Sequence, residues 1–231
     1  MSVFEGIDKR FFDKAVVYYS NVRVLDWQAY IGMALLGFAH GLNKPIFVWT
    51  SYSILIKLLI SHTLFLAFTF SINNCFDIKS DEQQEEKMRK NPIAAGHMSF
   101  KEGVILSLLI ASIGLMSTFI WFGGESFLLY VAMFFFGLAY SVPPLRLKSV
   151  PVIDLITHGL FFGIFLFLYG LLVAGGIPLH FLPIGISIFI CSVTFELRNH
   201  LEDLNADLSA GTTTTACWLG PTRTSELLGI L

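Results

Sequence analysis

Long apolar runs alternate with short polar segments along this 231-residue chain. A bilayer has a hydrocarbon core roughly 30 Å thick, so a helix that crosses it needs about 20 predominantly apolar residues. Six runs approach or exceed that length, and they cover Trp27–Leu42, Pro45–Ile72, Gly103–Trp121, Phe127–Val142, Ile153–Ala174 and Leu179–Phe195. The pattern predicts an all-α protein, a polytopic transmembrane helical bundle with about six complete spans.

Two flanking segments do not fit the pattern of complete spans. The stretch 9-KRFFDKAVVYYSNVRV-24 mixes apolar and basic residues, is too polar to span and has no signal-peptide cleavage site. We expect residues 1–24 to form an interfacial amino-terminal segment that lies on the membrane. The stretch 216-ACWLGPTRTSELLGIL-231 begins another apolar element and then stops. We therefore expect one transmembrane domain over residues 1–231, truncated at its carboxy terminus within a seventh span.

Composition and charge support a membrane protein with a definite orientation. Hydrophobic residues make up 55% of the chain and charged residues only 14%, which is too much apolar surface for one soluble core. Thirteen of the fifteen Lys and Arg residues fall in the amino-terminal segment and in the loops after the second, fourth and sixth runs. Because basic residues concentrate in cytoplasmic loops, the amino terminus is predicted to be cytoplasmic, in a plasma or inner membrane.

Several common site types are absent from the sequence. The three cysteines, Cys75, Cys191 and Cys217, lack metal-ligand spacing, so we expect no disulfide and no zinc site. The sequence contains no Walker A loop, dinucleotide-binding fingerprint, HExxH or GxSxG. Nothing in it indicates binding of nucleic acid.

Two polar triplets share one spacing. The segment 73-NNCFDIKSD-81 places Asn73, Asp77 and Asp81 four residues apart, and 196-ELRNHLEDLNADLSAGTTTT-215 repeats that spacing with Asn199, Asp203 and Asp207. Four predicted spans separate the triplets, so both emerge on the same side of the membrane. Positions four apart on an α-helix drift by only about 40°. Each triplet therefore forms a polar stripe, and two facing stripes would line one acidic pocket.

The acidic pocket predicts a cation. Polar residues at a helix end are ordinary, because solvated ends need them, but two copies at matching ends of two spans are harder to explain in that way. Carboxylates at this density repel one another unless positive charge lies among them. Hard oxygen ligands in incomplete number suit Mg²⁺, which keeps waters and binds phosphate oxygens together with one or two carboxylates. The arrangement predicts a diphosphate bridged by Mg²⁺.

Three motifs in order resemble a known family. The first triplet with 91-NPIAAGHMS-99, the turn 140-YSVPPLRLK-148, and the second triplet with 210-AGTTTTACWLG-220 together resemble the UbiA superfamily of intramembrane prenyltransferases, of the 4-hydroxybenzoate polyprenyltransferase type. The resemblance runs from about residue 21 to the end. It implies an all-helical enzyme, usually of nine spans, that transfers a prenyl group from an isoprenyl diphosphate to an acceptor.

The resemblance also implies site residues. The carboxylates of the two motifs would be the catalytic groups and the Mg²⁺ ligands: Asp77, Asp81, Asp203 and Asp207. Substrate-binding candidates are the two motif asparagines, several basic residues and one tyrosine: Asn73, Asn199, Arg23, Lys87, Arg89, Lys90, Tyr140, Arg146 and Lys148. The partners would be the isoprenyl diphosphate donor, a small-molecule acceptor and the lipid bilayer. Several of the basic residues must serve only to orient the protein.

The chemistry needs positive charge at the diphosphate and aromatic faces at the allylic cation that ionisation leaves. Tyr140, just before the Pro-Pro turn, is the aromatic residue that we favour, and an interfacial tyrosine is the ordinary alternative. Asp154 and His158 could supply a base for the acceptor, although a helix-terminal aspartate and a packing histidine explain them as well. Asn91 stands where many family members carry Arg, so no arginine contact is expected there.

The acceptor and the class of protein leave alternatives open. The breadth of the aromatic branch favours an aromatic acceptor, as in quinone biosynthesis, and a lipid or carotenoid acceptor is the alternative within the family. A cation transporter is the alternative outside it, because ionisable residues of membrane helices often form ion sites. A transporter would bury its charges near mid-membrane on broken helices, whereas these acidic residues cluster at helix ends. The Asp-Gly-x-x-Ala-Arg core of CDP-alcohol transferases is absent.

Overall fold

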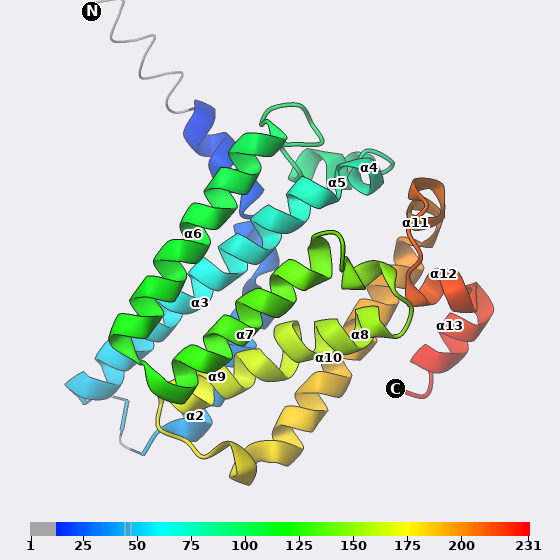
Figure 1. Ribbon diagram of the computed structural model, residues 1–231. Coiled ribbons are helices and arrows are strands. Elements are labelled where there is room, and N and C mark those ends of the chain that lie inside the picture. The colour runs from blue at the N-terminus through cyan, green and yellow to red at the C-terminus, as the bar shows by residue number, and fades with distance from the viewer. Residues whose placement is uncertain (1–12, 44, 47) are drawn as a thin grey trace, which may run out of the picture.

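The computed structural model describes residues 13–43, 45, 46 and 48–231. This part of the chain is helical and contains no strand (Figure 1). The long helices are α2 (Gln28–Gly41), α3 (Trp49–Phe76), α6 (Phe100–Trp121), α7 (Gly124–Ser141) and α10 (Leu182–Glu202). A sixth long element is composite and consists of α8 (Ile153–His158), a π-helical turn η3 (Gly159–Ile164) and α9 (Phe165–Val173). The predicted all-α bundle is confirmed.

Short elements connect the long ones. They are η1 (Val24–Asp26), α4 (Ile78–Asp81), α5 (Glu85–Lys90), η2 (Leu147–Ser149), η4 (Pro178–Phe181), α11 (Leu204–Ala210), α12 (Thr215–Leu219) and α13 (Pro221–Leu228). The helices α4, α5 and α11 gather at one end of the bundle (Figure 1), and α4 packs against α11. We call this the mouth end.

The six predicted runs all form helices, with shifted boundaries. The second run begins later than expected and continues four residues further, so that α3 carries Asn73 inside its last turn. Among the described residues, five elements are long and apolar enough to cross a membrane, namely α3, α6, α7, the composite Ile153–Val173 and Pro178–Glu202. The first run forms α2, which has 14 residues and is not among these five.

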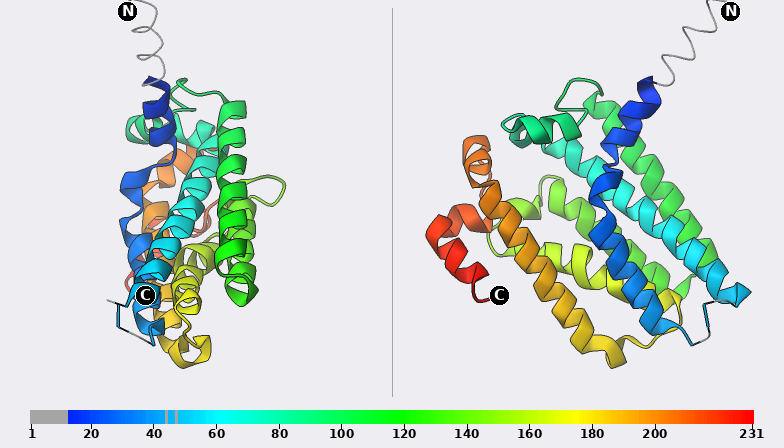
Figure 2. Two further views of the ribbon diagram at one scale, coloured as in Figure 1. Left: turned by 90° about the vertical axis from the view of Figure 1, so that its left-hand side faces the viewer. Right: turned by 180° about the vertical axis from the view of Figure 1, so that it is seen from behind.

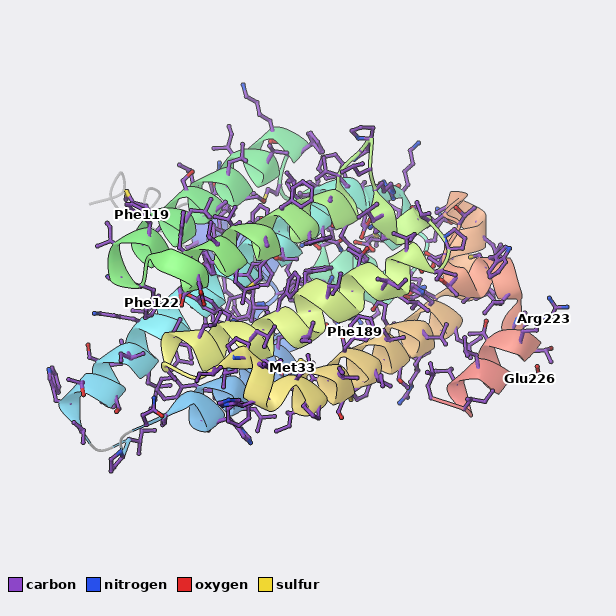
Figure 3. The ribbon with its side chains drawn as sticks, turned by 60° about the horizontal axis from the view of Figure 1, so that its bottom comes forward. Met33, Phe119, Phe122, Phe189, Arg223 and Glu226 are labelled. Carbon is purple, nitrogen blue, oxygen red and sulfur yellow. The ribbon has the colours of Figure 1, made fainter. Side chains whose placement is uncertain are left out.

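The two flanking segments differ from expectation or lie partly outside the described chain. Of the predicted interfacial segment, residues 1–12 lie outside the described residues, and residues 13–21 are helical and largely exposed. The segment 216–231 is not one continuous helix. Gly220 adopts a positive φ of 78° and is followed by Pro221, so α12 ends there and α13 begins as a separate short helix. Arg223 and Glu226 project from α13 away from the bundle (Figure 3).

Aromatic side chains fill the centre of the bundle. Phe65, Tyr130 and Tyr169 are fully buried. The Tyr130 hydroxyl donates to the carbonyl oxygen of Ser61 at 2.5 Å, and the Ser61 and Tyr169 hydroxyls lie 2.7 Å apart. Since lipid is as apolar as these side chains, close packing and internal hydrogen bonds hold such helices together.

The outer faces of the long helices are apolar and exposed. On α6, Met116, Phe119 and Ile120 are each more than 60% exposed, and Figure 3 shows Phe119 at the end of α6 next to α7. Ser99 caps the start of this helix, because its hydroxyl accepts from the Glu102 amide while the Glu102 carboxylate accepts from the Ser99 amide. A bundle with a packed centre and an apolar exterior is the arrangement expected of an integral membrane protein.

Tight crossings hold the remaining helices. Seen from behind, α2 lies across the bundle between α3 and α10 (Figure 2), and it packs along α9. Phe189 of α10 lies against Gly159, where the π-helical turn begins (Figure 3). These contacts bring one end of α2, α3, α7, α8 and α10 around a common space at the mouth end.

Candidate active site

Both triplets lie where a long helix meets a short one. Asp77 ends α3 and precedes α4, and Asp203 ends α10 and precedes α11. The four-residue backbone bonds continue across both junctions: the amide of Asp77 donates to the Asn73 carbonyl, and that of Asp203 to the Asn199 carbonyl. The stripes expected from the spacing therefore form, although each helix is interrupted at its middle aspartate.

Asp77 is surrounded by positive charge from the turn after α7. The Lys148 ammonium makes an ion pair with Asp77 and donates to the Asn73 side-chain oxygen at 3.2 Å. Arg146 lies 3.6 Å from Asp77 and donates to the Phe76 carbonyl at 3.1 Å, which anchors the turn to the end of α3. The basic residues of the 140–148 segment thus reach the first triplet.

Asp203 and Asp207 are contacted by side chains at and just after the end of the first triplet. Lys87 of α5 forms an ion pair with Asp203 at 2.5 Å, and Gln84 donates to the other oxygen of the same carboxylate at 3.2 Å. Ser80 of α4 lies 3.5 Å from Asp207. Side chains that follow the first triplet therefore contact the second triplet, which places the two acidic motifs face to face.

Asp81 is held by Asn91, which lies just after α5. Asn91 is buried and donates to Asp81 at 2.8 Å and to the Asn74 carbonyl at 2.9 Å. Its side-chain oxygen accepts from the Ile93 amide at 3.0 Å. Asn91 therefore fixes the loop after α5 and the orientation of Asp81, and an arginine would disrupt this arrangement.

Arg23 and Lys90 approach from the amino-terminal side. Arg23 donates through Nε to Asp26 at 2.8 Å, and its guanidinium lies 5.2 Å above the Phe70 ring. The Lys90 ammonium lies 3.3 Å from Glu86 and 4.0 Å from Asp26. Both cations are thus paired at the rim rather than free.

These side chains surround a cavity of about 540 Å³. The lining includes every predicted site residue except Arg89: Arg23, Asn73, Asp77, Asp81, Lys87, Lys90, Tyr140, Arg146, Lys148, Asn199, Asp203 and Asp207. Arg89 is exposed on α5 and lies outside this lining. Tyr30, Phe70 and Phe162 add an aromatic wall, with Tyr30 and Phe162 stacked at 4.4 Å between ring centroids.

Burial shifts the ionisation of several mouth-end groups. Removal from water raises the pKa of Asp81 above its ordinary value, and it raises that of Asp207, to which the neighbouring Asp203 charge adds. Burial also lowers the pKa of Lys148 to about 7. The raised pKa values of these carboxylates and the lowered pKa of Lys148 show that burial disfavours the charged form of each group. Perturbed pKa values of this kind are common in ligand-binding sites.

The cavity floor contains residues that the sequence did not single out. Glu196, on α10 one turn before Asn199, is 9% exposed, and His200 is 6% exposed. His158, which we considered as a base, lines the cavity with them, whereas Asp154 lies behind the lining and accepts from the backbone amide and hydroxyl of Thr215. A signal was available, since Glu196 lies seven residues before Asp203 and so lies on nearly the same face of α10.

The carboxylates that line the cavity are candidate ligands for a metal ion. Within the described residues, no three His, Cys, Asp or Glu side chains lie close enough together to hold an ion. The carboxylates instead form pairs with Lys148 and Lys87 across the cavity. The oxygen donors are hard, few and widely spaced. They fit an ion that takes its remaining ligands from water and phosphate rather than one enclosed by protein.

The comparisons with known proteins agree with the fold and the motifs. The model of the UbiA prenyltransferase family matches residues 27–231. The chain therefore belongs to the UbiA prenyltransferase family, which confirms the predicted class of enzyme and disfavours a cation transporter.

Two curated proteins are similar to this chain. A probable chloroplastic homogentisate phytyltransferase 2 of Oryza sativa subsp. japonica is 36% identical over 85 residues, which is 37% of this chain and 22% of that protein. A lycopene elongase/hydratase of Halobacterium salinarum is 27% identical over 202 residues, which is 85% of this chain and 69% of that protein.

A solved structure is similar in fold. It is a UbiA homologue from Archaeoglobus fulgidus bound to GPP and Mg²⁺, with a TM-score of 0.79, 24% sequence identity, and coverage of 92% of this chain and 72% of that one. At this identity the likeness supports the bundle architecture.

Proposed function

We propose that this protein transfers a prenyl group from an isoprenyl diphosphate to an acceptor and releases diphosphate, with Mg²⁺ as the cofactor. The observation that carries the proposal is the pair of acidic stripes that face one another across a cavity. Lys148 forms an ion pair with the first stripe at Asp77, and Lys87 forms one with the second stripe at Asp203. Asp77, Asp81, Asp203 and Asp207 would hold the metal.

The metal would neutralise charge that develops on the diphosphate when the donor ionises. The chain's own residues support the same step. Lys148, Lys87 and Arg146 supply positive charge at the mouth of the cavity. The stacked Tyr30 and Phe162 rings offer negative π faces beyond it, where an allylic cation would be stabilised and kept from water.

The acceptor is proposed to be a hydroxylated aromatic compound. The cavity floor presents a tyrosine, a carboxylate and two histidines, namely Tyr140, Glu196, His158 and His200. Such groups suit an acceptor with a polar, ionisable hydroxyl better than a pure hydrocarbon, because a hydroxyl can hydrogen-bond to them and a hydrocarbon cannot. This accords with the aromatic acceptor named for the rice relative.

A carotenoid acceptor is the second candidate. The lycopene elongase/hydratase is similar over 85% of this chain, and the aromatic wall formed by Tyr30, Phe70 and Phe162 could contact a polyene. The two candidates differ in which part of the cavity the acceptor contacts, so an acceptor panel separates them.

The distribution of basic residues supports an orientation with the amino terminus and the acidic motifs on the cytoplasmic side of a plasma or inner membrane. In that orientation a water-soluble diphosphate would leave directly into the cytoplasm.

The proposal is tested with purified protein in lipid nanodiscs. Diphosphate release is measured from geranylgeranyl and longer polyprenyl diphosphates, with and without Mg²⁺, and with 4-hydroxybenzoate, homogentisate and lycopene as acceptors. Asp77→Asn and Asp203→Asn are each expected to reduce metal-dependent release by at least about 100-fold, as loss of a charge-stabilising group does. Arg89→Ala, which alters an exposed residue outside the cavity, serves as control. Undiminished turnover in both aspartate variants contradicts the site.

A further inference from the structure

Glu196 extends the second acidic stripe one turn deeper into the membrane. It precedes Asn199 by three residues and Asp203 by seven, so all three lie on one face of α10. At 9% exposure it is nearly buried, yet it lines the cavity. It is thus a carboxylate on the cavity floor, and it is separate from the four aspartates assigned to the metal.

Three helices direct polar groups at the Glu196 carboxylate. From α7, the Tyr140 hydroxyl donates to Oε1 at 2.5 Å. From α8, His158 Nε2 lies 3.3 Å from Oε2. From α10 itself, His200 Nε2 lies 3.2 Å from Oε1, and the Asn199 amide donates to Oε2 at 3.2 Å. A buried charge is costly unless it is paired in this way, so the surroundings stabilise the ionised carboxylate.

A second carboxylate lies behind the first. His200 Nδ1 lies 3.5 Å from Asp154 but forms no hydrogen bond there. Asp154 is fully buried and accepts from the Thr215 amide at 2.6 Å. The other ring nitrogen of His158 contacts the Ser192 hydroxyl at 3.1 Å. The two histidines therefore lie between Glu196 and other polar groups, with Asp154 on the far side of His200.

This cluster has a chemical use that the mouth-end groups lack. Asp77 and Asp203 are engaged by lysines and would be engaged by metal during turnover, so they are poor acceptors of a proton. A general base must be close to the proton that it removes and must remain free for that task. Glu196 lies beyond the diphosphate site, and among the described residues its ion-pair partners are histidines rather than Lys or Arg, so it can take up a proton that Asp77 and Asp203 cannot.

We propose that Glu196 is the general base that takes the proton lost by the acceptor. The inference rests on the proposed function. The C–O bond of the donor breaks and its electron pair leaves with the diphosphate, and the acceptor supplies the pair that forms the new C–C bond. The cationic adduct then loses the proton of the reacting carbon to the Glu196 carboxylate, the C–H bond pair stays on the product, and the product becomes neutral. Tyr140, His158 and His200 are positioning residues, which orient Glu196 and share its proton until it leaves through the mouth to water.

The groups that influence this base come from every element around the cavity floor. Besides Tyr140, His158 and His200, Tyr30 of α2 and Lys148 of η2 line the same cavity. None of these groups is a carboxylate that could replace Glu196 at the floor. A change at position 196 should therefore alter the pH profile of transfer, which a merely structural role would not do.

The test separates proton removal from donor ionisation. Glu196→Gln and Glu196→Asp are compared with wild type, with the acceptor from the panel that wild type turns over, supplied with hydrogen or deuterium at the reacting carbon. In Glu196→Gln, transfer is expected to fall about 100-fold or more, as for loss of a general base, and to fall far more than donor-only diphosphate release. The acidic limb of its pH profile should disappear, and the deuterium isotope effect should rise above that of wild type. Glu196→Asp should recover part of the transfer rate.

Each contrary outcome points to a different failure. Equal losses of transfer and of donor-only release in both variants would make Glu196 structural and overturn the inference. Unchanged transfer or an unchanged isotope effect would overturn it as well. If wild type released no metal-dependent diphosphate from any donor, the proposed function itself would fail and the inference with it. A thermal shift on addition of donor and Mg²⁺ checks that each variant is folded.

Discussion

The two ends of the bundle are held together by opposite means. Away from the mouth, α2 and α9 cross so closely that β-carbons at Gly37 and Gly170 would collide with the carbonyl oxygens of Phe167 and Ala34. At the mouth, charged side chains hold the helices around a cavity through pairs such as Lys148 with Asp77. Backbone contacts of the first kind offer no alternative arrangement. Ion pairs of the second kind can be exchanged for ligand contacts, so a rigid end supports an end that can bind.

The largest expected effect is at the glycine crossing. Gly170→Ala places a methyl group against the backbone of α2, and overpacking of this kind is expected to cost about 3 kcal/mol in unfolding free energy. Gly32→Ala, on an exposed part of α2 with no neighbouring atom within 4 Å of an added β-carbon, is the matched control and should be neutral or stabilising. Thermal unfolding in detergent measures both, and equal melting temperatures would show that the crossing is not rigid.

An intermediate effect is expected at Lys148. Lys148→Gln keeps a hydrogen-bond donor but removes the positive charge that pairs with Asp77 of the first triplet. Charge-assisted bonds contribute about 2 kcal/mol, so the donor KM should rise about 30-fold while the melting temperature changes little. Lys148→Arg keeps the charge and should restore much of the affinity. A loss of stability without a change in KM would assign Lys148 to the fold instead of the donor site.

The smallest expected effect distinguishes two neighbours on α5. Lys87 pairs with Asp203 but is one-third exposed, so its contribution is limited to about 1 kcal/mol by solvent screening. Lys87→Ala should weaken donor binding about fivefold. Arg89→Ala should leave it unchanged, because this side chain lies outside the cavity. Donor titrations of the two variants at low and high salt measure the difference, and equal effects would mean that general positive charge is sufficient.

The sequence predicted the spans better than it predicted the floor of the site. Apolar runs identify helices because a bilayer requires about 20 such residues in succession, and the four-residue spacing identified stripes because backbone geometry sets it. The π-helical turn at Gly159–Ile164 leaves no comparable pattern in the apolar composition. The break at Gly220 was missed because its apolar neighbours outweighed a glycine followed by a proline.

Glu196 itself shares a helix face with Asp203 and so carried a local signal, but the cluster around it was missed for a tertiary reason. Its partners Tyr140 and His158 come from two other helices, and no local pattern shows that three helices converge there. Asn91 was interpreted only as a missing arginine, whereas the structure gives it a positive role in holding Asp81. Residues that act through distant contacts carry little local signal, while residues that share one helix face carry a strong one.

The junctions at Asp77 and Asp203 should tolerate changes in chain length much less well than the exposed turn that follows the first motif. Because the four-residue backbone bonds continue through both junctions, one inserted residue between Asn73 and Asp81, or between Asn199 and Asp207, would rotate the following carboxylates by about 100° and turn them away from the cavity. An insertion in the exposed turn around residue 82 would lengthen a connection without moving either stripe. Changes in chain length are therefore constrained by the number of residues within each motif, and far less in the exposed turn that follows the first motif.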